Sequence, residues 1–232
     1  MKSLLNPGRV AGLWYLLLVL SGPLRLLYIP SKLIVSADPA ATAHNIVAHA
    51  WLFRWGMVDE VAMAVILIFL VMAFWRLFEG VDRGLAALVV IFGGVMPATL
   101  HLTGTVTDAG AMLAAQGADF LSAFSPAQRD GLVMLFLKLH GWQYTSAETL
   151  WGVWLLPLAV LVYRSRFIPR VLGLWLALNG IAYVIISATG LLLPQYQGRV
   201  FSLATPALYG ELAIMLWLVI LGAKPPAAAA KA

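Results

Sequence analysis

Cysteine is absent from the 232 residues of this sequence, and charged residues are scarce. Without cysteine the chain cannot form disulfides, thiolate metal sites or a cysteine nucleophile. Charged residues make up only 11% of the chain and hydrophobic residues 62%, and the mean hydropathy is +0.91. Soluble domains of this length do not normally have such a composition, so we expect an integral membrane protein.

Motifs of nucleotide-driven chemistry are missing as well. The sequence contains no Gly-rich phosphate loop, no Asp-rich diphosphate motif, no Gly-x-Ser-x-Gly elbow and no dinucleotide fingerprint. Chemistry driven by ATP or NAD is therefore not expected, and the cofactor, if any, stays unknown. The net charge of +5 requires no nucleic-acid partner, because basic cytoplasmic loops and their attraction to anionic lipid account for it.

Long apolar runs recur along almost the whole chain. A helix needs about 20 apolar residues to cross the hydrocarbon core. Because the runs lack the period-2 alternation of barrel strands, each is predicted to be a helix. The expected fold is an all-α, polytopic membrane helical bundle, with a six-helix transmembrane domain over residues 1–223 and a disordered cytoplasmic tail over 224–232. The six predicted spans are 10–29, 57–75, 84–106, 144–163, 170–193 and 204–222.

The basic residues predict the orientation of these spans, since cytoplasmic loops retain Lys and Arg. With six spans both ends of the chain share a side, and nine basic residues fall on that side against six on the other. Both termini are therefore predicted to be cytoplasmic. The nine are Lys2, Arg9, Arg76, Arg83, Arg164, Arg166, Arg170, Lys224 and Lys231.

Two segments on the outer side are predicted to form amphipathic helices at the membrane surface. The first begins at Asp38, a good N-cap that is followed by proline, and runs through His49. The second begins at the capping box Ser125-Pro-Ala-Gln128 and runs through Lys138 and His140. Several aromatic residues would then lie at the outer interface: Trp51, Trp55, Trp142 and Tyr144.

Three glutamates recur at matching places, early in apolar runs that head toward a basic residue. At 1.5 Å per residue their carboxylates stand about 20 to 24 Å above those basic residues, in the outer half of the bilayer. A carboxylate inside hydrocarbon costs on the order of 2.5 to 3.5 kcal/mol, so the repetition needs a reason. The pairs are Glu60 sixteen residues before Arg76, Glu148 sixteen before Arg164 and Glu211 thirteen before Lys224.

An internal repeat accompanies the glutamates. Arg9-Val-Ala-Gly-Leu-Trp14 opens the first span, Arg170-Val-Leu-Gly-Leu-Trp175 opens the fifth, and Arg83 starts a fainter echo at the third. The simplest description is three helical hairpins of similar build and the same orientation. This differs from the inverted repeat of many transporters.

Several segments together identify a resemblance to a known family. They are Arg9–Leu16, Ala40–Ile46 with Trp51–Gly56, and Gly152–Leu158 with Phe167–Gly173. Through them nearly the whole chain resembles the uncharacterised bacterial integral-membrane family called domain of unknown function forty-three eighty-six. Its members look like six-helix membrane proteins, so the resemblance implies this fold and a bacterial inner membrane. It implies no activity, cofactor or catalytic residue.

The predicted ligand-binding or proton site gathers around the three glutamates. If the even spans face one another, the carboxylates could share protons or hold a cation, with Arg25 and His101 as partners and Asp108 marking the outer flank of the third span. Successive helical residues point about 100° apart, so only one of two neighbouring acids need face inward. A structural interpretation stays open, because acids are favoured near helix N-termini and can form ion pairs with arginine. The predicted set is Glu60, Glu148, Glu211, His101, Arg25 and Asp59.

The histidines do not predict a metal site. His44 and His49 are five residues apart, about 140° around a helix, so they cannot form a same-face zinc pair. Haem ligation by His101 would need a second histidine at a similar depth, and the predicted spans place none there. The segment Gly93-Gly-Val-Met-Pro97 predicts a kink in the span that carries His101.

Three functions are compatible with these residues. The first is a non-enzymatic membrane protein that binds a lipid-like or small amphipathic ligand, or a partner subunit, in a polar pocket in the outer half of the bilayer. The second is an intramembrane enzyme acting on a lipid or isoprenoid, with Glu148 or Glu211 as base and His101 as acid or metal ligand. The third is a proton- or cation-coupled transporter that uses the same carboxylates.

Overall fold

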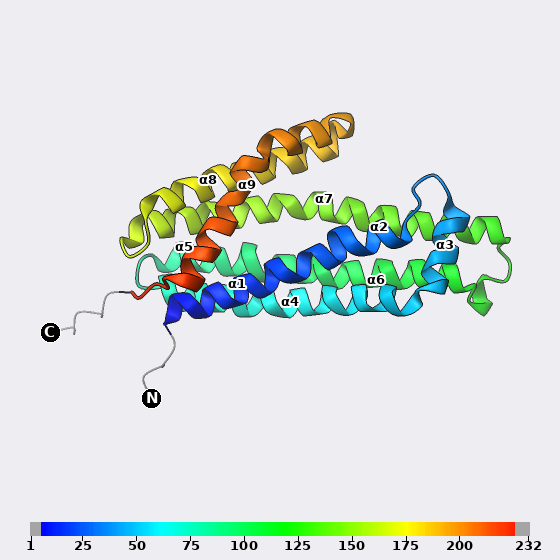
Figure 1. Cartoon of the computed structure of the whole chain (residues 1–232), viewed down its shortest axis with the longest axis horizontal. Helices are drawn as coiled ribbons and strands as arrows, with labels where there is room; N and C mark the ends of the chain where they lie inside the picture. Colours follow the sequence, from blue (N-terminus) through cyan, green and yellow to red (C-terminus); the bar gives the residue numbers. More distant parts are fainter. Residues whose placement is uncertain (1–5, 226–232) are drawn as a thin grey trace. The chain divides into compact units, whose positions relative to one another are not determined.

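The computed structural model describes residues 6–225, and every regular element in that range is helical (Figure 1). The predicted disordered tail falls outside the described residues from position 226 on. The α-helices are α1 (Pro7–Pro23), α2 (Ile29–Leu33), α3 (Pro39–Ala48), α4 (Ala50–Phe78), α5 (Arg83–Val90), α6 (Met96–Gln116), α7 (Pro126–Ser165), α8 (Arg170–Leu192) and α9 (Gln197–Ile220). Two π-helical turns, Leu24–Tyr28 and Ile91–Val95, and two 3-10 turns, Asp119–Leu121 and Pro194–Tyr196, join them.

Six helical segments in the described part of the chain are long and apolar enough to cross a membrane. This confirms the prediction of an all-α membrane protein with six spans. All of the segments except the fifth are longer than the predicted spans, and a π-helical turn lies within the first and within the third without ending either of them. The six segments are Pro7–Leu33, Ala50–Phe78, Arg83–Gln116, Pro126–Ser165, Arg170–Leu192 and Pro194–Ile220.

The chain divides into two compact units. Unit 1 consists of residues 1–18, 65–98 and 145–232, and unit 2 of residues 19–64 and 99–144. All the boundaries fall inside helices, so α1, α4, α6 and α7 each contribute residues to both units.

Unit 2 is built around an apolar core between α2, α3, α4, α6 and α7. Its fully buried members include Ile29, Leu33 and Ile46. The short α3 begins as predicted, since the Asp38 side chain accepts a hydrogen bond from the Ala41 amide at 2.9 Å. Ala111 and Val133 contribute to the same core from α6 and α7. That α3 lies on the membrane surface stays a prediction.

The second predicted surface helix is not a separate element. Its capping box is present, since the Ser125 amide donates to the Gln128 side chain at 2.8 Å and the Gln128 amide donates back to the Ser125 hydroxyl at 3.3 Å. From Pro126 the helix then continues for 40 residues to Ser165 and includes the fourth span. Nothing between Lys138 and Tyr144 breaks it, because that stretch contains no proline and Gly141 alone costs only about 1 kcal/mol.

Unit 1 depends on close approaches between helices. At the crossing of α7 and α8, a Cβ added to Gly180 would lie 2.8 Å from the Gly152 carbonyl oxygen, so only glycine fits there. Two helical turns farther on, the Ser187 hydroxyl donates to the Thr145 carbonyl at 2.6 Å. Helices α8 and α9 pack against each other, and they lie side by side where α8 ends and α9 begins (Figure 1).

The predicted kink in the third span is a π-helical turn at Ile91–Val95. Gly93 lies in this turn, and a Cβ added there would come within 2.8 Å of the Trp154 ring. The glycine therefore makes room for a buried indole of α7, which is 4% exposed. Irregular helical turns of this kind leave backbone groups that need another arrangement of hydrogen bonds.

Candidate functional site

Arg25 occupies the π-helical turn that follows α1 and is only 4% exposed. Gly56 of α4 lies beside it: a Cβ added to Gly56 would stand 3.6 Å from Arg25 Cδ and 2.7 Å from Ile29 Cδ1. The glycine therefore lets the arginine stem and the start of α2 approach α4 closely. An arginine buried among membrane-spanning helices needs negative partners within reach.

Asp108 of α6 is the first of these partners. The Arg25 Nη2 atom lies 2.8 Å from both carboxylate oxygens of Asp108, which is 1% exposed. A charge-assisted contact of this length is among the stronger polar interactions in proteins. Asp108 was predicted to mark the outer flank of the third span, and this was wrong, because α6 continues to Gln116 and Asp108 is buried.

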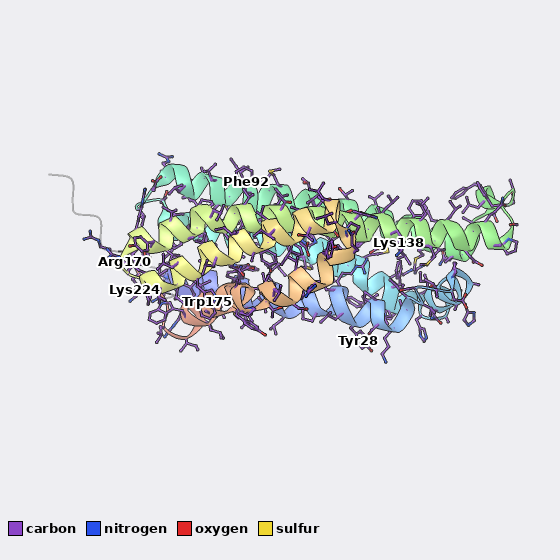
Figure 2. All side chains as sticks on the ribbon, turned by 90° about the horizontal axis from the view of Figure 1, so that it is seen from above. Tyr28, Phe92, Lys138, Arg170, Trp175 and Lys224 are labelled. Atoms are coloured by element: carbon purple, nitrogen blue, oxygen red, sulfur yellow. The ribbon has the colours of Figure 1, made fainter. Side chains whose placement is uncertain are left out.

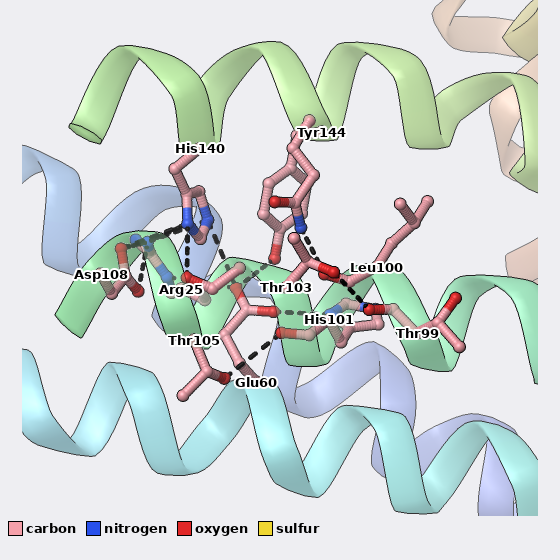
Figure 3. A network of polar contacts seen from close by, with 12 residues as sticks. Arg25, Glu60, Thr99, Leu100, His101, Thr103, Thr105, Asp108, His140 and Tyr144 are labelled. Carbon is pink, nitrogen blue, oxygen red and sulfur yellow. Dashed lines mark hydrogen bonds and ion pairs between the residues drawn. The ribbon is translucent and has the colours of Figure 1, made fainter. Parts of the chain in front are cut away.

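Glu60 of α4 is fully buried and is the second partner (Figure 3). Its Oε2 lies 2.6 Å from His101 Nδ1, and its Oε1 accepts a hydrogen bond from the Tyr144 hydroxyl at 2.6 Å. Arg25 Nε lies 3.2 Å from Oε1, an ion-pair distance, although the Nε hydrogen does not make a hydrogen bond. Glu60 thus joins residues from the first span, α6 and α7.

His140 of α7 completes the group. Its Nε2 and Nδ1 lie 2.9 and 3.2 Å from Arg25 Nη2, and Nδ1 is also 3.2 Å from Asp108 Oδ1. Its ring stacks on Tyr144, one helical turn farther along, with centroids 5.1 Å apart. We call Arg25, Glu60, His101, Asp108, His140 and Tyr144 the unit 2 cluster.

The geometry of the unit 2 cluster suits a proton better than a metal ion. No group of three or more His, Asp or Glu residues between positions 6 and 225 is arranged to hold a metal. The guanidinium of Arg25 lies against Asp108, Glu60 and His140 and supplies the positive charge that a metal would otherwise supply. Next to the cluster, the Gln143 amide donates to the Leu100 carbonyl and joins α7 to α6.

A second polar group lies in unit 1 around Glu211 of α9. The buried Tyr15 hydroxyl donates to Glu211 Oε1, and the Asn179 amide nitrogen donates to Oε2 at 3.2 Å. Tyr183 also lies close to this carboxyl. In the part of unit 1 that the structure describes, two buried acceptors have no hydrogen-bond partner, Asn179 Oδ1 and Glu148 Oε2.

The six residues singled out in the sequence are therefore divided between the two units. Arg25, Glu60 and His101 meet in the unit 2 cluster. Asp59 is only partly buried, and its Oδ2 has no hydrogen-bond partner among residues 6–225. Glu148 and Glu211 belong to unit 1.

Sequence reasoning missed His140, Asp108 and Tyr144 as members of the cluster. The expectation that no second histidine accompanies His101 was wrong, because His140 Nε2 lies 3.5 Å from the same Glu60 carboxylate. A helical spacing signal was present: His101 and Asp108 are seven residues apart, and His140 and Tyr144 are four apart, so each pair shares a helix face. The assumed break between the surface helix and the fourth span concealed the second pair.

Comparisons with known proteins give one result. The family model described as Domain of unknown function (DUF4386) matches residues 10–222. No curated protein and no solved structure matches the chain.

Proposed function

Because the chain belongs to the family described as Domain of unknown function (DUF4386), which brings no activity with it, we propose a function from the unit 2 cluster. The protein binds one proton at His101 and Glu60, and its activity in the membrane depends on that proton. The cluster lies within segments able to span a membrane. Ionisable residues in such places commonly mark proton or substrate pathways.

The charge balance of the cluster is the observation that carries this proposal. Arg25 contributes one positive charge and the two carboxylates, Glu60 and Asp108, contribute one negative charge each. With both imidazoles neutral the formal charge is therefore 1 − 2 = −1. A net charge is costly here, because the arginine, both carboxylates and both imidazoles are buried. One added proton brings the formal charge to zero.

The contacts favour His101 over His140 as the residue that holds the proton. Arginine only donates hydrogen bonds, so the His140 nitrogen nearest to Arg25, Nε2 at 2.9 Å, has to accept one. An imidazolium has no acceptor nitrogen, so this contact favours neutral His140. His101 directs Nδ1 at Glu60 over 2.6 Å and can donate this bond as an imidazolium.

We also propose where in the cell the protein lies. The protein lies in a bacterial inner membrane with both termini in the cytoplasm. Nine basic residues on the side of the termini against six on the other support this orientation. Membrane lipid is then the immediate surrounding of all six spans.

Nitrogen NMR on histidine-labelled protein tests the proton site directly, because the chain has only four histidines. The exposed His44 and His49 can be replaced by glutamine, which leaves only the two cluster imidazoles visible. From the contacts we expect His101 to carry protons on both ring nitrogens and His140 to be neutral. Glu60→Gln should abolish the His101 imidazolium, since its counter-charge is lost.

Asp59→Asn is the matched control, because it neutralises the neighbouring carboxylate, which forms no ion pair with His101 between positions 6 and 225. It should change the two histidine spectra much less than Glu60→Gln does. Two neutral imidazoles in the unmutated cluster, or equal effects of the two substitutions, would overturn the proposal.

A ligand-binding function is the second candidate, favoured by the two unpartnered acceptors of unit 1. Asn179 is fully buried, and an acceptor left without a donor in an apolar surrounding is costly. Hydroxyl or ammonium groups of a lipid-like or small amphipathic ligand, or of a membrane partner subunit, would satisfy Asn179 Oδ1 and Glu148 Oε2. The enzyme alternative gains no such support, because its expected bases belong to unit 1 and His101 to unit 2.

Native mass spectrometry of the gently purified protein, with metal analysis of the same sample, tests the second candidate. A bound amphipathic molecule should remain with the unmutated protein and be lost in Asn179→Leu. Asn45→Leu removes an amide from unit 2 and should have no effect on the bound mass. An unmutated protein that carries nothing would remove this candidate.

A further inference from the structure

The turn between α7 and α8 borders a pocket that the proposed proton site does not involve. Its volume is about 550 Å³, within the range of sites that take small molecules. The pocket lies entirely within unit 1. Its lining residues are Arg166, Phe167, Ile168, Pro169, Arg170 and Trp217.

Two arginines of this pocket have no negative partner. Arg166 and Arg170 are exposed, and neither forms an ion pair with a carboxylate in the described part of the chain. Arg164, two residues before Arg166, differs from them: its Nη1 lies 3.1 Å from Asp82 Oδ2, and it is not part of the lining. The guanidinium of Arg170 lies 5.1 Å from the centroid of the Tyr163 ring. The pocket therefore concentrates positive charge that no carboxylate between positions 6 and 225 neutralises in an ion pair.

The start of α8 adds to this positive charge. No side chain caps the helix at Pro169, and its first turn contains no acidic residue. The first amides of a helix lack acceptors within the helix and form the positive end of its dipole, where anions are favoured. Arg170, a cation, occupies the first position instead. An anion in the pocket would offset both the arginines and the helix end.

Trp217 supplies a further donor from α9. Its indole Nε1 is buried in the wall of the pocket and has no hydrogen-bond partner between positions 6 and 225. Tryptophan has only this one polar atom, and it usually finds an acceptor when it is buried.

The backbone of the turn is also unusual at Arg166. This residue has φ 62°, the left-handed region that Gly or Asn adopts more easily than a long side chain. Neighbouring contacts hold the turn, since the Ser165 hydroxyl donates to the Val162 carbonyl at 2.8 Å. This conformation costs free energy, which indicates that the Arg166 side chain has a functional role in addition to forming the turn.

We propose that this pocket binds a phosphate group, carried by the headgroup of an anionic phospholipid. The turn joins two segments able to span the membrane, so the pocket lies at a membrane surface, where lipid phosphates are found. Arg170 and Lys224 lie at the same end in Figure 2. Two guanidinium groups, the α8 amides and the Trp217 indole are donors suited to phosphate oxygens.

Lipid retention in native mass spectrometry tests the site with phosphatidylglycerol and phosphatidylcholine as probes. The unmutated protein should retain phosphatidylglycerol in preference to phosphatidylcholine. The double variant Arg166→Asn, Arg170→Gln should retain it about tenfold less, because two charge-assisted contacts are lost. Asparagine is chosen at 166 because it tolerates the left-handed backbone. Trp217→Phe removes the indole N–H, keeps an aromatic ring and leaves both arginines in place, so it should cause a smaller loss.

Arg164→Gln is the matched control, since it removes the same charge from the end of α7, next to the pocket but outside its lining. It should retain phosphatidylglycerol as well as the unmutated protein does. Thermal stabilisation by inorganic phosphate, abolished in the double variant, would support the phosphate site. It would also show that free phosphate binds there without a lipid. Equal lipid retention in the double variant and in Arg164→Gln, together with no response to phosphate, would overturn the proposal. Circular dichroism confirms that each variant is folded.

Discussion

Arg25 holds the unit 2 cluster together at the scale of single residues. Its guanidinium lies 2.8 Å from Asp108 and 3.2 Å from Glu60, and none of the three side chains is more than 5% exposed. The two acids would be an isolated pair of like charges without it. A buried ion pair adds little net stability over an apolar pair, but loss of one partner is severe, because the other charge stays buried.

Arg25→Met should therefore lower the free energy of unfolding by about 3 to 5 kcal/mol. Thermal or denaturant unfolding in detergent measures the change. Arg54→Met provides the comparison, because Arg54 is exposed on the same α4 that carries Glu60, and removal of an exposed arginine should cost less than about 1 kcal/mol. Similar losses in the two variants would show that Arg25 is not the residue on which the acids depend.

Part of this cluster could be predicted from the sequence because a charge inside an apolar run is conspicuous. Arg25, Glu60 and His101 were identified in this way. Asp108 was not, because it lies near the end of an apolar run and was taken as the flank of the span. Which acid pairs with Arg25 depends on helix rotation, and hydropathy carries no information about rotation.

At the scale of elements, helix α7 shows what could and could not be predicted from the sequence. Its start was predicted because a capping box satisfies specific backbone groups. Its continuation through Gly141 was not predicted, since a change from polar to apolar sequence within one helix resembles a boundary between two helices. At 1.5 Å per residue its 40 residues extend about 60 Å, about twice the thickness of the hydrocarbon core.

Two glycines of α7 should respond in opposite ways to alanine. Gly152 faces the Gly180 carbonyl at the crossing with α8, so Gly152→Ala forces the helices apart and should cost about 1 to 3 kcal/mol. Gly131 has nothing within 4 Å of an added Cβ, so Gly131→Ala should stabilise the helix by about 0.5 to 1 kcal/mol. Unfolding of both variants in detergent measures the two effects. Destabilisation by Gly131→Ala, or none by Gly152→Ala, would contradict this account of the crossing.

The order of the six spans sets the topology of the whole molecule. It could be predicted from the sequence, because in lipid every backbone group must find a partner within its own helix or a closed sheet, and long apolar runs satisfy this as helices. The division into two units could not be predicted. It depends on which helix faces pack together, and the apolar residues of a span do not distinguish a lipid-facing side from a packed side.

The absence of cysteine allows a direct test of this topology, since each introduced cysteine is the only thiol in the chain. Gly80→Cys lies in the turn between α4 and α5, and Ser122→Cys in the exposed segment before α7. With both termini cytoplasmic, a membrane-impermeant maleimide should label Ser122→Cys in intact cells and Gly80→Cys only after the membrane is opened. The reverse pattern would show that the orientation is opposite to the predicted one. Labelling of both cysteines in intact cells would contradict the six spans.

The π-helical turn at Leu24–Tyr28 has a consequence for the length of the chain. Such a turn contains one residue more than the α-helical turn that it replaces. Deletion of a single residue there would restore α-helical register and rotate Arg25 and α2 by about 100° relative to the residues before the turn. A relative that lacks this one-residue insertion should therefore place its arginine on another helix face, and it would need a different cation opposite Glu60 and Asp108, or no acids at those positions.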